Sequence, residues 1–202
     1  MCIRDRFNLA LLLERLDPPD LESARSWYTR AAEAGHTGAQ FNLAELLIKL
    51  DPPDLDGART WYTQAAEAGD TEAQFVLGLL LAGALKPPDL NGARIWWTRA
   101  AEAGHNDAQF NLGRLLATRL DPPDLAEARI WWTQAAEAGD ADAQFNLGVL
   151  LADLLDPPDL AEARIWWTRA AERGDTGAQF KLGVVAYGPD PPDLAEAQTW
   201  TA

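Results

Sequence analysis

The chain has 202 residues, 48% hydrophobic and 24% charged, which is enough for one or two ordinary domains with a substantial core. Its net charge of −14 opposes nucleic acid and anionic lipid, which are bound through basic surfaces, and favours neutral or basic partners. Cys2 is the single cysteine, so an internal disulfide is excluded, and with two histidines it cannot complete a four-ligand zinc site. No apolar stretch approaches the roughly 18 residues of a membrane span and no secretory signal is visible, so the localisation is left open.

Residues 1–6 precede a repeated pattern and do not belong to it. Aligning residues 7–10 with residues 41–44 leaves Met1 to Arg6 without counterparts in the later copies. We interpret residues 1–6 as a non-repeat start, resembling translated adapter sequence, and residues 7–202 as an array of five to six repeats.

The remainder of the chain repeats every 34 or 35 residues. Pro-Pro-Asp-Leu begins at positions 18, 52, 87, 122, 157 and 191, and Ala-Gln-Phe begins at positions 39, 73, 108, 143 and 178. Each copy holds two helical segments joined by short loops, which makes the helices antiparallel neighbours. A period of this size is typical of tetratricopeptide-like arrays. The predicted fold is all-α: an α/α superhelix, formed as a right-handed solenoid of antiparallel helical hairpins.

The first helix of a copy is clearest at residues 124–138. Asp124 is placed to cap it and Glu127 to complete a capping box, as are Asp159 with Glu162 and Asp193 with Glu196. A glycine able to adopt the left-handed conformation ends the first helix of each copy: Gly35, Gly69, Gly104, Gly139 and Gly174.

Two ladders of side chains mark this first helix. We expect one tryptophan per copy to fill the space between hairpins: Trp27, Trp61, Trp96, Trp131 and Trp166. A second ladder consists of Arg25, Arg59, Arg94, Arg129 and Arg164. These arginines could bind an acidic ligand, but we expect their stems to cover tryptophan while their heads pair with carboxylates.

The second helix of a copy is clearest at residues 140–155. Asp140 is placed to cap this helix. His36 and His105 hold the same position in other copies, so we expect each of them at a helix start and not in a metal site. The helix is apolar on both flanks, which predicts packing on both sides and leaves one narrow strip outside the core. One glutamine recurs in each copy on the apolar side of this helix: Gln40, Gln74, Gln109, Gln144 and Gln179. We expect its side-chain amide to form a hydrogen bond with a turn backbone in the neighbouring hairpin.

The narrow strip is the candidate protein-binding surface, because the copies agree at packing positions and differ along it. Its residues are Asn42, Glu45, Lys49, Val76, Leu79, Asn111, Arg114, Thr118, Asn146, Val149, Asp153 and Lys181. Its asparagines, with Asn8, could hydrogen-bond an extended peptide or serve a local structural role, and the sequence leaves both open. We expect no catalytic residue, cofactor or metal, because serine occurs only at positions 23 and 26, beside no histidine, and no phosphate-binding glycine loop occurs.

The end of the chain stops midway through a helix that the other copies complete, at residues 196–202. Arrays of this kind need terminal repeats with a polar outer face, and none is visible. We therefore interpret the array as truncated at both ends.

The string Ala-Gln-Phe-Asn-Leu-Gly-Val-Leu-Leu from Ala143, followed by Ala163-x-x-Trp166-x-x-x-Ala-Ala-Glu-x-Gly174, resembles the Sel-like (suppressor/enhancer of lin) repeat family, relatives of tetratricopeptide repeats. The likeness runs from Phe7 to Trp200 and implies an α/α superhelix that serves as an adaptor for multiprotein assembly. Two features depart from the family: Asp-Pro-Pro-Asp replaces a glycine-rich turn, and Leu47, Leu116 and Leu151 stand where tyrosine is frequent.

Three hypotheses for function follow. The first is a non-enzymatic scaffold that binds protein or peptide segments on the inner helix surface. The second is a regulatory or docking arm of a larger enzyme whose catalytic domain lies outside this sequence. The third is end-to-end self-association through apolar hairpin faces.

Overall fold

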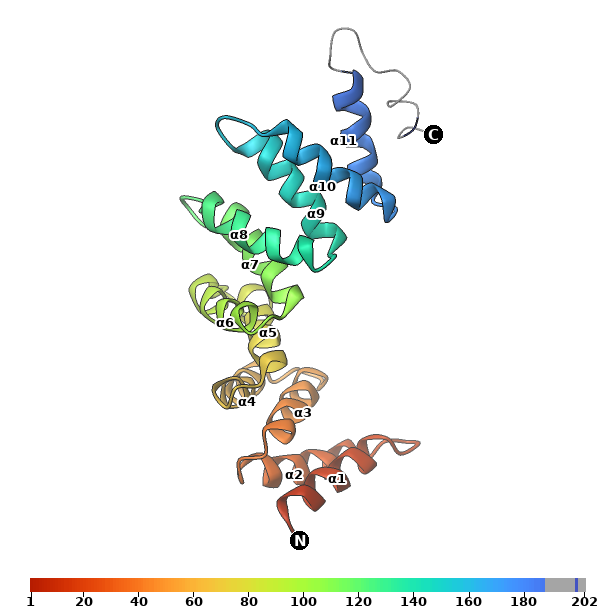
Figure 1. The fold of residues 1–202 in the computed structure, drawn as a ribbon. Coiled ribbons are helices and arrows are strands. Elements are labelled where there is room, and N and C mark those ends of the chain that lie inside the picture. The colour runs from red at the N-terminus through yellow and green to blue at the C-terminus, as the bar shows by residue number, and fades with distance from the viewer. Residues whose placement is uncertain (188–198, 200–202) are drawn as a thin grey trace. The chain divides into compact units, whose positions relative to one another are not determined.

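The computed structural model describes residues 1–187 and residue 199, and within them every regular element is helical (Figure 1). This confirms the predicted all-α repeat solenoid. The chain divides into two compact units, the first spanning Met1–His105 and the second beginning at Asn106.

The first unit contains α1 (Ile3–Glu14), α2 (Leu21–Ala32), α3 (Thr37–Ile48), α4 (Leu55–Glu67), α5 (Thr71–Leu79), a short π-helical turn η1 (Leu80–Ala84) and α6 (Leu90–Glu102). The second contains α7 (Asn106–Thr118), α8 (Leu125–Glu137), α9 (Ala141–Val149), the π-helical turn η2 (Leu150–Leu154), α10 (Leu160–Glu172) and α11 (Thr176–Tyr187). Helices joined by the Asp-Pro-Pro-Asp or Lys-Pro-Pro-Asp turn pack against each other most extensively, as α1 does with α2 and α7 with α8.

Residues 3–6 are the first turn of α1. The Asp5 N–H donates to Cys2 Sγ at 3.4 Å, and Asp5 Oδ2 accepts from the Cys2 N–H at 3.1 Å, which together form a capping box. Cys2 stands 34 residues before His36, the N-cap of α3, so α1 begins at the same register as the matching helix of the next copy although its first residues differ in type. Their interpretation as a non-repeat start stays a prediction.

Helix starts and ends follow the predicted capping pattern. Asp124 Oδ1 accepts a hydrogen bond from the Glu127 N–H at 3.0 Å. The five predicted glycines have φ between +85° and +97°, the left-handed region that a Cβ disfavours. The predicted capping boxes at Asp124 and Asp159 are wrong in one respect: the N–H groups of these two aspartates donate to the Leu116 and Leu151 carbonyls at 2.9 and 2.8 Å, and not to the glutamates. Glu127 Oε1 accepts from the Trp131 indole at 3.3 Å. Glu162 Oε1 likewise accepts from Trp166 Nε1 at 3.3 Å, and its Oε2 accepts from Arg129 at 2.6 Å. A nearby indole and guanidinium compete successfully for this carboxylate. The third predicted box, at Asp193, lies outside the described residues.

The aromatic core sits one residue later than predicted. Of the predicted tryptophans, Trp27, Trp61, Trp96 and Trp131 are only half-buried, although Trp166 is buried. The next residue in each copy is at most 3% exposed: Tyr28, Tyr62, Trp97, Trp132 and Trp167. Adjacent helical positions differ by 100°, so both fall within a broad apolar arc and only the packed neighbour decides which one is covered.

The buried tryptophans are held in the same way in both units. The Trp97 Nε1–H donates to the Phe75 carbonyl at 3.1 Å, and the Trp132 and Trp167 indoles donate to the Phe110 and Phe145 carbonyls at 3.1 and 3.3 Å. These bonds satisfy the one polar group that each indole brings into the core.

Each of these indoles lies against a glycine. A Cβ added at Gly78, Gly113 or Gly148 would lie 2.3, 2.6 or 2.4 Å from the tryptophan facing it. The two copies with a buried tyrosine have alanine at the matching positions, Ala10 and Ala44. The smaller phenol thus accompanies alanine, and the larger indole accompanies glycine.

The glutamine and arginine ladders are partly as predicted. Gln40, Gln74 and Gln144 are buried and donate to the carbonyls of Ala32, Ala66 and Ala136 at 3.0–3.2 Å. These acceptors lie at the end of the preceding helix of the same hairpin, so the prediction of a turn backbone in the neighbouring hairpin was wrong. Gln40 Nε2 does reach the next hairpin, where it donates to the Gln64 side chain at 3.3 Å. Arg129 pairs with Glu162 as expected. The guanidinium groups over tryptophan, however, belong to Arg30, Arg99 and Arg169, three residues after each ring, because positions i and i+3 share a helix face.

Candidate protein-binding strip

All twelve predicted strip residues lie at least partly outside the core. In the first unit they come from α3 and its end and from α5; in the second they come from α7, α9, η2 and α11. Lys49, Leu79, Arg114, Thr118 and Asp153 are exposed and the other seven are half-buried. The positions between them are filled by buried leucine, alanine and glycine, which fix the helices that carry the strip.

The asparagines of the strip are tied to the protein itself. Asn111 Nδ2 donates to the Asp107 carbonyl at 2.8 Å, and Asn146 Nδ2 donates to the Asp142 carbonyl at 2.7 Å, both one turn back in their own helices. Asn42 Nδ2 instead donates to the Tyr28 hydroxyl at 3.3 Å. These contacts support the local structural role, one of the two alternatives that the sequence leaves open.

The strip of the second unit carries charged side chains in defined positions. Arg114 donates to Asn111 Oδ1 at 2.8 Å and lies 5.9 Å from the centre of the Phe110 ring. Lys181 Nζ is 2.5 Å from Asp153 Oδ2 and lies over the Trp167 ring. The strip thus presents a guanidinium, an ion pair and the apolar Val149 on accessible helix surface.

In the first unit a buried hydroxyl network supports the strip. Tyr28 donates to Glu14 Oε2 at 2.7 Å while it accepts from Asn42, and Lys49 Nζ lies 3.9 Å from Glu14. Burial, together with the Glu14 contact, raises the pKa of the Tyr28 phenol above its ordinary value. The phenol is therefore a neutral donor at physiological pH.

Tyr62 holds the position of Tyr28 in the next copy. Neither Tyr62 nor Glu72 was among the predicted site residues. Tyr62 is 1% exposed, and burial raises the pKa of its phenol, with further contributions from the negative charges of Glu45 and Glu72. A comparison of the copies could have identified the difference between the two tyrosines. Glu14 and Asn42, the partners of the Tyr28 hydroxyl, are replaced one repeat later by Ile48 and Val76.

His36 and His105 occupy helix starts, as predicted. His36 Nδ1 accepts from the Ala39 N–H at 3.1 Å and its ring stacks on Phe7. His105 stacks on Phe75, and its Nε2 lies 3.1 Å from Glu72 Oε2. Within residues 1–187 and residue 199, no three histidine, cysteine, aspartate or glutamate side chains gather as metal ligands.

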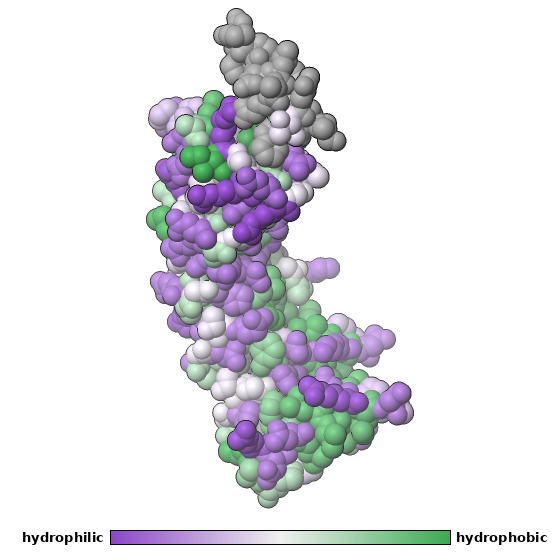
Figure 2. All heavy atoms as spheres, turned by 45° about the vertical axis from the view of Figure 1, so that its right-hand side comes forward, coloured by the Kyte–Doolittle hydropathy of each residue, from purple (hydrophilic) through white to green (hydrophobic). Residues whose placement is uncertain are grey.

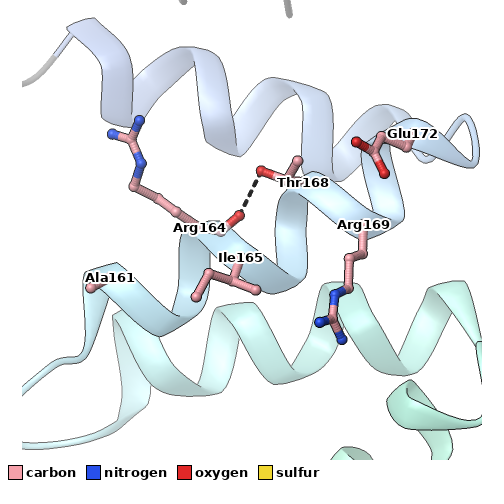
Figure 3. Close-up of a pocket in the computed structure, with 6 residues that line it drawn as sticks. All are labelled: Ala161, Arg164, Ile165, Thr168, Arg169 and Glu172. Carbon is pink, nitrogen blue, oxygen red and sulfur yellow. Dashed lines mark hydrogen bonds between the residues drawn. The ribbon is translucent and has the colours of Figure 1, made fainter.

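A pocket of about 590 Å³ lies along α10 (Figure 3). It is lined by Ala161, Arg164, Ile165, Thr168, Arg169 and Glu172. The figure shows Arg164 and Arg169 pointing away from each other, and the Thr168 hydroxyl donates to the Arg164 carbonyl at 2.8 Å. Because the two guanidinium groups do not converge, this pocket does not form a site for one small anion.

The family follows from a comparison with models of known repeats. The Sel1 repeat model matches residues 6–36, 37–70, 71–105, 106–140, 141–175 and 176–201. The chain belongs to the Sel1 repeat family. From the second match on, each Sel1 repeat begins at the start of a second helix, so it pairs α3 with α4 and α7 with α8, the pairs that pack most closely.

Solved structures with Sel1 repeats have the same fold. The protective antigen c5321 of uropathogenic Escherichia coli, which displays an SLR fold, is 28% identical with a TM-score of 0.76 over 98% of this chain. A Sel1 repeat protein from Oxalobacter formigenes is also 28% identical, with a TM-score of 0.68 and coverage of 98% of this chain and 85% of its own. This chain spans only 44% of the Escherichia coli protein. No curated protein matches the sequence.

Sel1 repeat proteins generally serve as scaffolds for protein interaction, and the family is generally non-catalytic. No helix of this Sel1 array, within the part of the chain that the structure describes, is long and apolar enough to cross a membrane.

Proposed function

We propose that this Sel1 array is a non-enzymatic scaffold that binds a protein or peptide segment through the strip. The observation that carries the proposal is the contrast between matching positions in successive copies. Leu43, Leu77, Leu112 and Leu147 are identical and at most 1% exposed. Two residues further on, the strip holds Glu45, Leu79, Arg114 and Val149, which are accessible and chemically different. A surface that differs between otherwise identical copies can discriminate among ligands.

Charge supports a neutral or basic partner. The net charge is −14, and Asp107, Asp142 and Glu72 are exposed near the starts of the helices that carry the strip. Such a field raises the rate of encounter with basic segments and lowers it with acidic ones.

Binding through the strip predicts that two exposed side chains are needed for partner capture. Changing Arg114 and Asp153 to alanine removes one positive and one negative charge from the second-unit strip, with no net change in charge. We expect partners captured from a host extract by the unaltered chain to be lost, and the affinity of an identified partner to fall about tenfold or more, a loss of about 1.4 kcal/mol. Quantitative mass spectrometry followed by calorimetry measures both.

A matched control changes Arg169 and Glu172 to alanine. These exposed residues of α10 also remove one charge of each sign, but they lie on the pocket of Figure 3 and outside the strip. Unchanged capture by this control supports the strip. Loss of capture by the control alone would move the binding site to the α10 surface, and equal capture by all three proteins would refute a role for Arg114 and Asp153.

We also propose that copies of the chain associate through the surface of α1. Figure 2 shows apolar surface in the region of α1, where Leu12 is 60% exposed. The leucines at the same register in later copies, Leu46, Leu80, Leu115 and Leu150, are at most 5% exposed. An exposed side chain at a packing position is suited to bury against a second copy.

Sedimentation velocity over a range of concentrations tests this association. The unaltered chain is expected to shift to larger species as concentration rises, and Leu12→Gln is expected to remain monomeric because a polar side chain opposes burial at this position. Identical monomeric behaviour of both proteins would exclude the association.

A further inference from the structure

The first helix of each of five copies carries a tryptophan directly before the buried aromatic, and the residue three positions later is arginine in three copies and glutamine in two. In the copies with arginine, the guanidinium carbon lies 4.6–4.7 Å from the ring centre of the tryptophan: Arg30 over Trp27, Arg99 over Trp96 and Arg169 over Trp166. Residues three apart share a helix face, which brings the two side chains together. The ring face at this position therefore carries a guanidinium wherever the copy supplies one.

In the two copies with glutamine, the side-chain amide is bound by a buried glutamine of the preceding hairpin. Gln134 Oε1 accepts from Nε2 of Gln109 on α7 at 3.2 Å, and Gln64 Oε1 accepts from Nε2 of Gln40 on α3 at 3.3 Å. Gln109 and Gln40 are each 6% exposed, and a buried amide donor is costly to leave without an acceptor. These bonds draw the carboxamides of Gln134 and Gln64 toward the preceding hairpin.

Trp131, in one of the copies with glutamine, has a ring that is fixed but not covered by a cation. Its Nε1–H donates to Glu127 Oε1 at 3.3 Å, and the Trp166 Nε1–H donates to Glu162 Oε1 at the same distance, so the two indoles are anchored in the same way. Trp166 is 7% exposed beneath Arg169, whereas Trp131 is half-buried. Among the described residues, no arginine or lysine lies over the Trp131 ring.

We propose that this uncovered face of Trp131 is a binding site, the Trp131 subsite, for one arginine side chain of a partner polypeptide. The arginines of the chain itself show the ligand and its geometry at three matching positions, with the guanidinium 4.6–4.7 Å from the ring centre. A guanidinium is planar and weakly hydrated, so it stacks on an aromatic face, and the net charge of −14 attracts basic segments. The Trp131 subsite goes beyond the proposed function, because α8 carries no residue of the strip.

The experiment uses the full chain and the peptide acetyl-Gly-Arg-Gly-amide as the probe. Spectra of the ¹⁵N-labelled chain resolve the indole N–H groups of the nine tryptophans, and Trp131→Phe and Trp166→Phe assign the two signals of interest. The arginine peptide is expected to shift the Trp131 signal saturably and to leave the Trp166 signal in place, because Arg169 already covers that ring. Acetyl-Gly-citrulline-Gly-amide, similar in shape but neutral, is expected to bind about two- to fivefold more weakly, the contribution of one exposed cation–π contact.

Exchanging the two side chains that differ between these copies makes the assignment specific. Gln134→Arg is expected to place a guanidinium over Trp131 and abolish the response of its indole, and Arg169→Gln is expected to make the Trp166 indole responsive. The double variant combines both effects without changing the net charge, so the general attraction of an acidic chain for a basic peptide stays constant. Where Gln134→Arg lowers stability through loss of the Gln109 contact, Arg169→Gln alone provides the test, since it leaves Gln134 in place.

The Trp131 subsite is overturned by equal binding of the citrulline peptide, by equal shifts of the Trp131 and Trp166 signals in the unaltered chain, or by a Trp166 signal that stays silent in Arg169→Gln. These outcomes are separate from the proposed function, which the Arg114 and Asp153 variant tests on other helices. Loss of partner capture by that variant together with an unresponsive Trp131 indole would retain the strip and reject the subsite.

Discussion

Replacing Trp132 with alanine is expected to lower the free energy of unfolding by about 3–5 kcal/mol, the range for removing a buried aromatic from a core. Trp132 is 3% exposed, and its indole donates to the Phe110 carbonyl at 3.1 Å. The substitution leaves a cavity between α7 and α8 and removes the indole hydrogen bond to that carbonyl. Chemical denaturation followed by circular dichroism measures the loss without depending on tryptophan fluorescence.

Trp131→Ala is the matched control, since it removes the same side chain from the adjacent position. Trp131 is half-buried, and its indole donates to Glu127 at 3.3 Å on the helix surface. Its loss is expected to cost about 1 kcal/mol, the typical effect of a point substitution. If Trp131→Ala destabilised the chain as much as Trp132→Ala, the assignment of the core aromatic to the later position would be wrong.

Gly148→Ala is the second substitution expected to have a large effect, at about 1–3 kcal/mol of destabilisation. An added Cβ would lie 2.4 Å from Trp167 Nε1, and Trp167 is 1% exposed, so the indole has little room to shift. The penalty arises from overpacking, although alanine has the higher intrinsic helix propensity. The same denaturation measurement gives its size.

Combining Gly148→Ala with Trp167→Tyr recreates the alanine and tyrosine pair found at Ala44 and Tyr62. The double variant is expected to be more stable than the sum of the two single losses predicts, because the smaller ring makes space for the methyl group. Strict additivity in this double-mutant cycle would show that the two positions do not constrain each other.

The core and the strip have different requirements within the same helices. In α9, Leu147 and Gly148 are buried against neighbouring helices, whereas Asn146 and Val149, the residues on either side of this pair, are half-exposed. Changes at the strip should therefore alter binding with small effects on folding. This separation is what allows a repeat scaffold to vary its ligand while it keeps its architecture.

Most of the architecture follows from the sequence alone. The 34- or 35-residue period, the aspartates at helix starts and the glycine after each first helix predict an array of helical hairpins. The caps are predictable because they act within one or two turns of chain. The accessibility of the strip was also predictable, since a helix that is apolar on both flanks leaves a single edge outside the core.

Only the tertiary structure decided between residues that share a broad apolar arc. Trp131 and Trp132 are the same residue type at neighbouring positions of one apolar arc, so the sequence does not distinguish them. Trp132 is the buried one because Phe110 and Gly113 on α7 face it. In the same way, the Glu162 carboxylate serves Trp166 and Arg129 although the sequence favours a capping box. The Tyr62 hydroxyl differs from that of Tyr28 through residues on two neighbouring helices. The periodicity of one helix specifies a face, but the atoms that meet a given side chain depend on how the next helix packs against it.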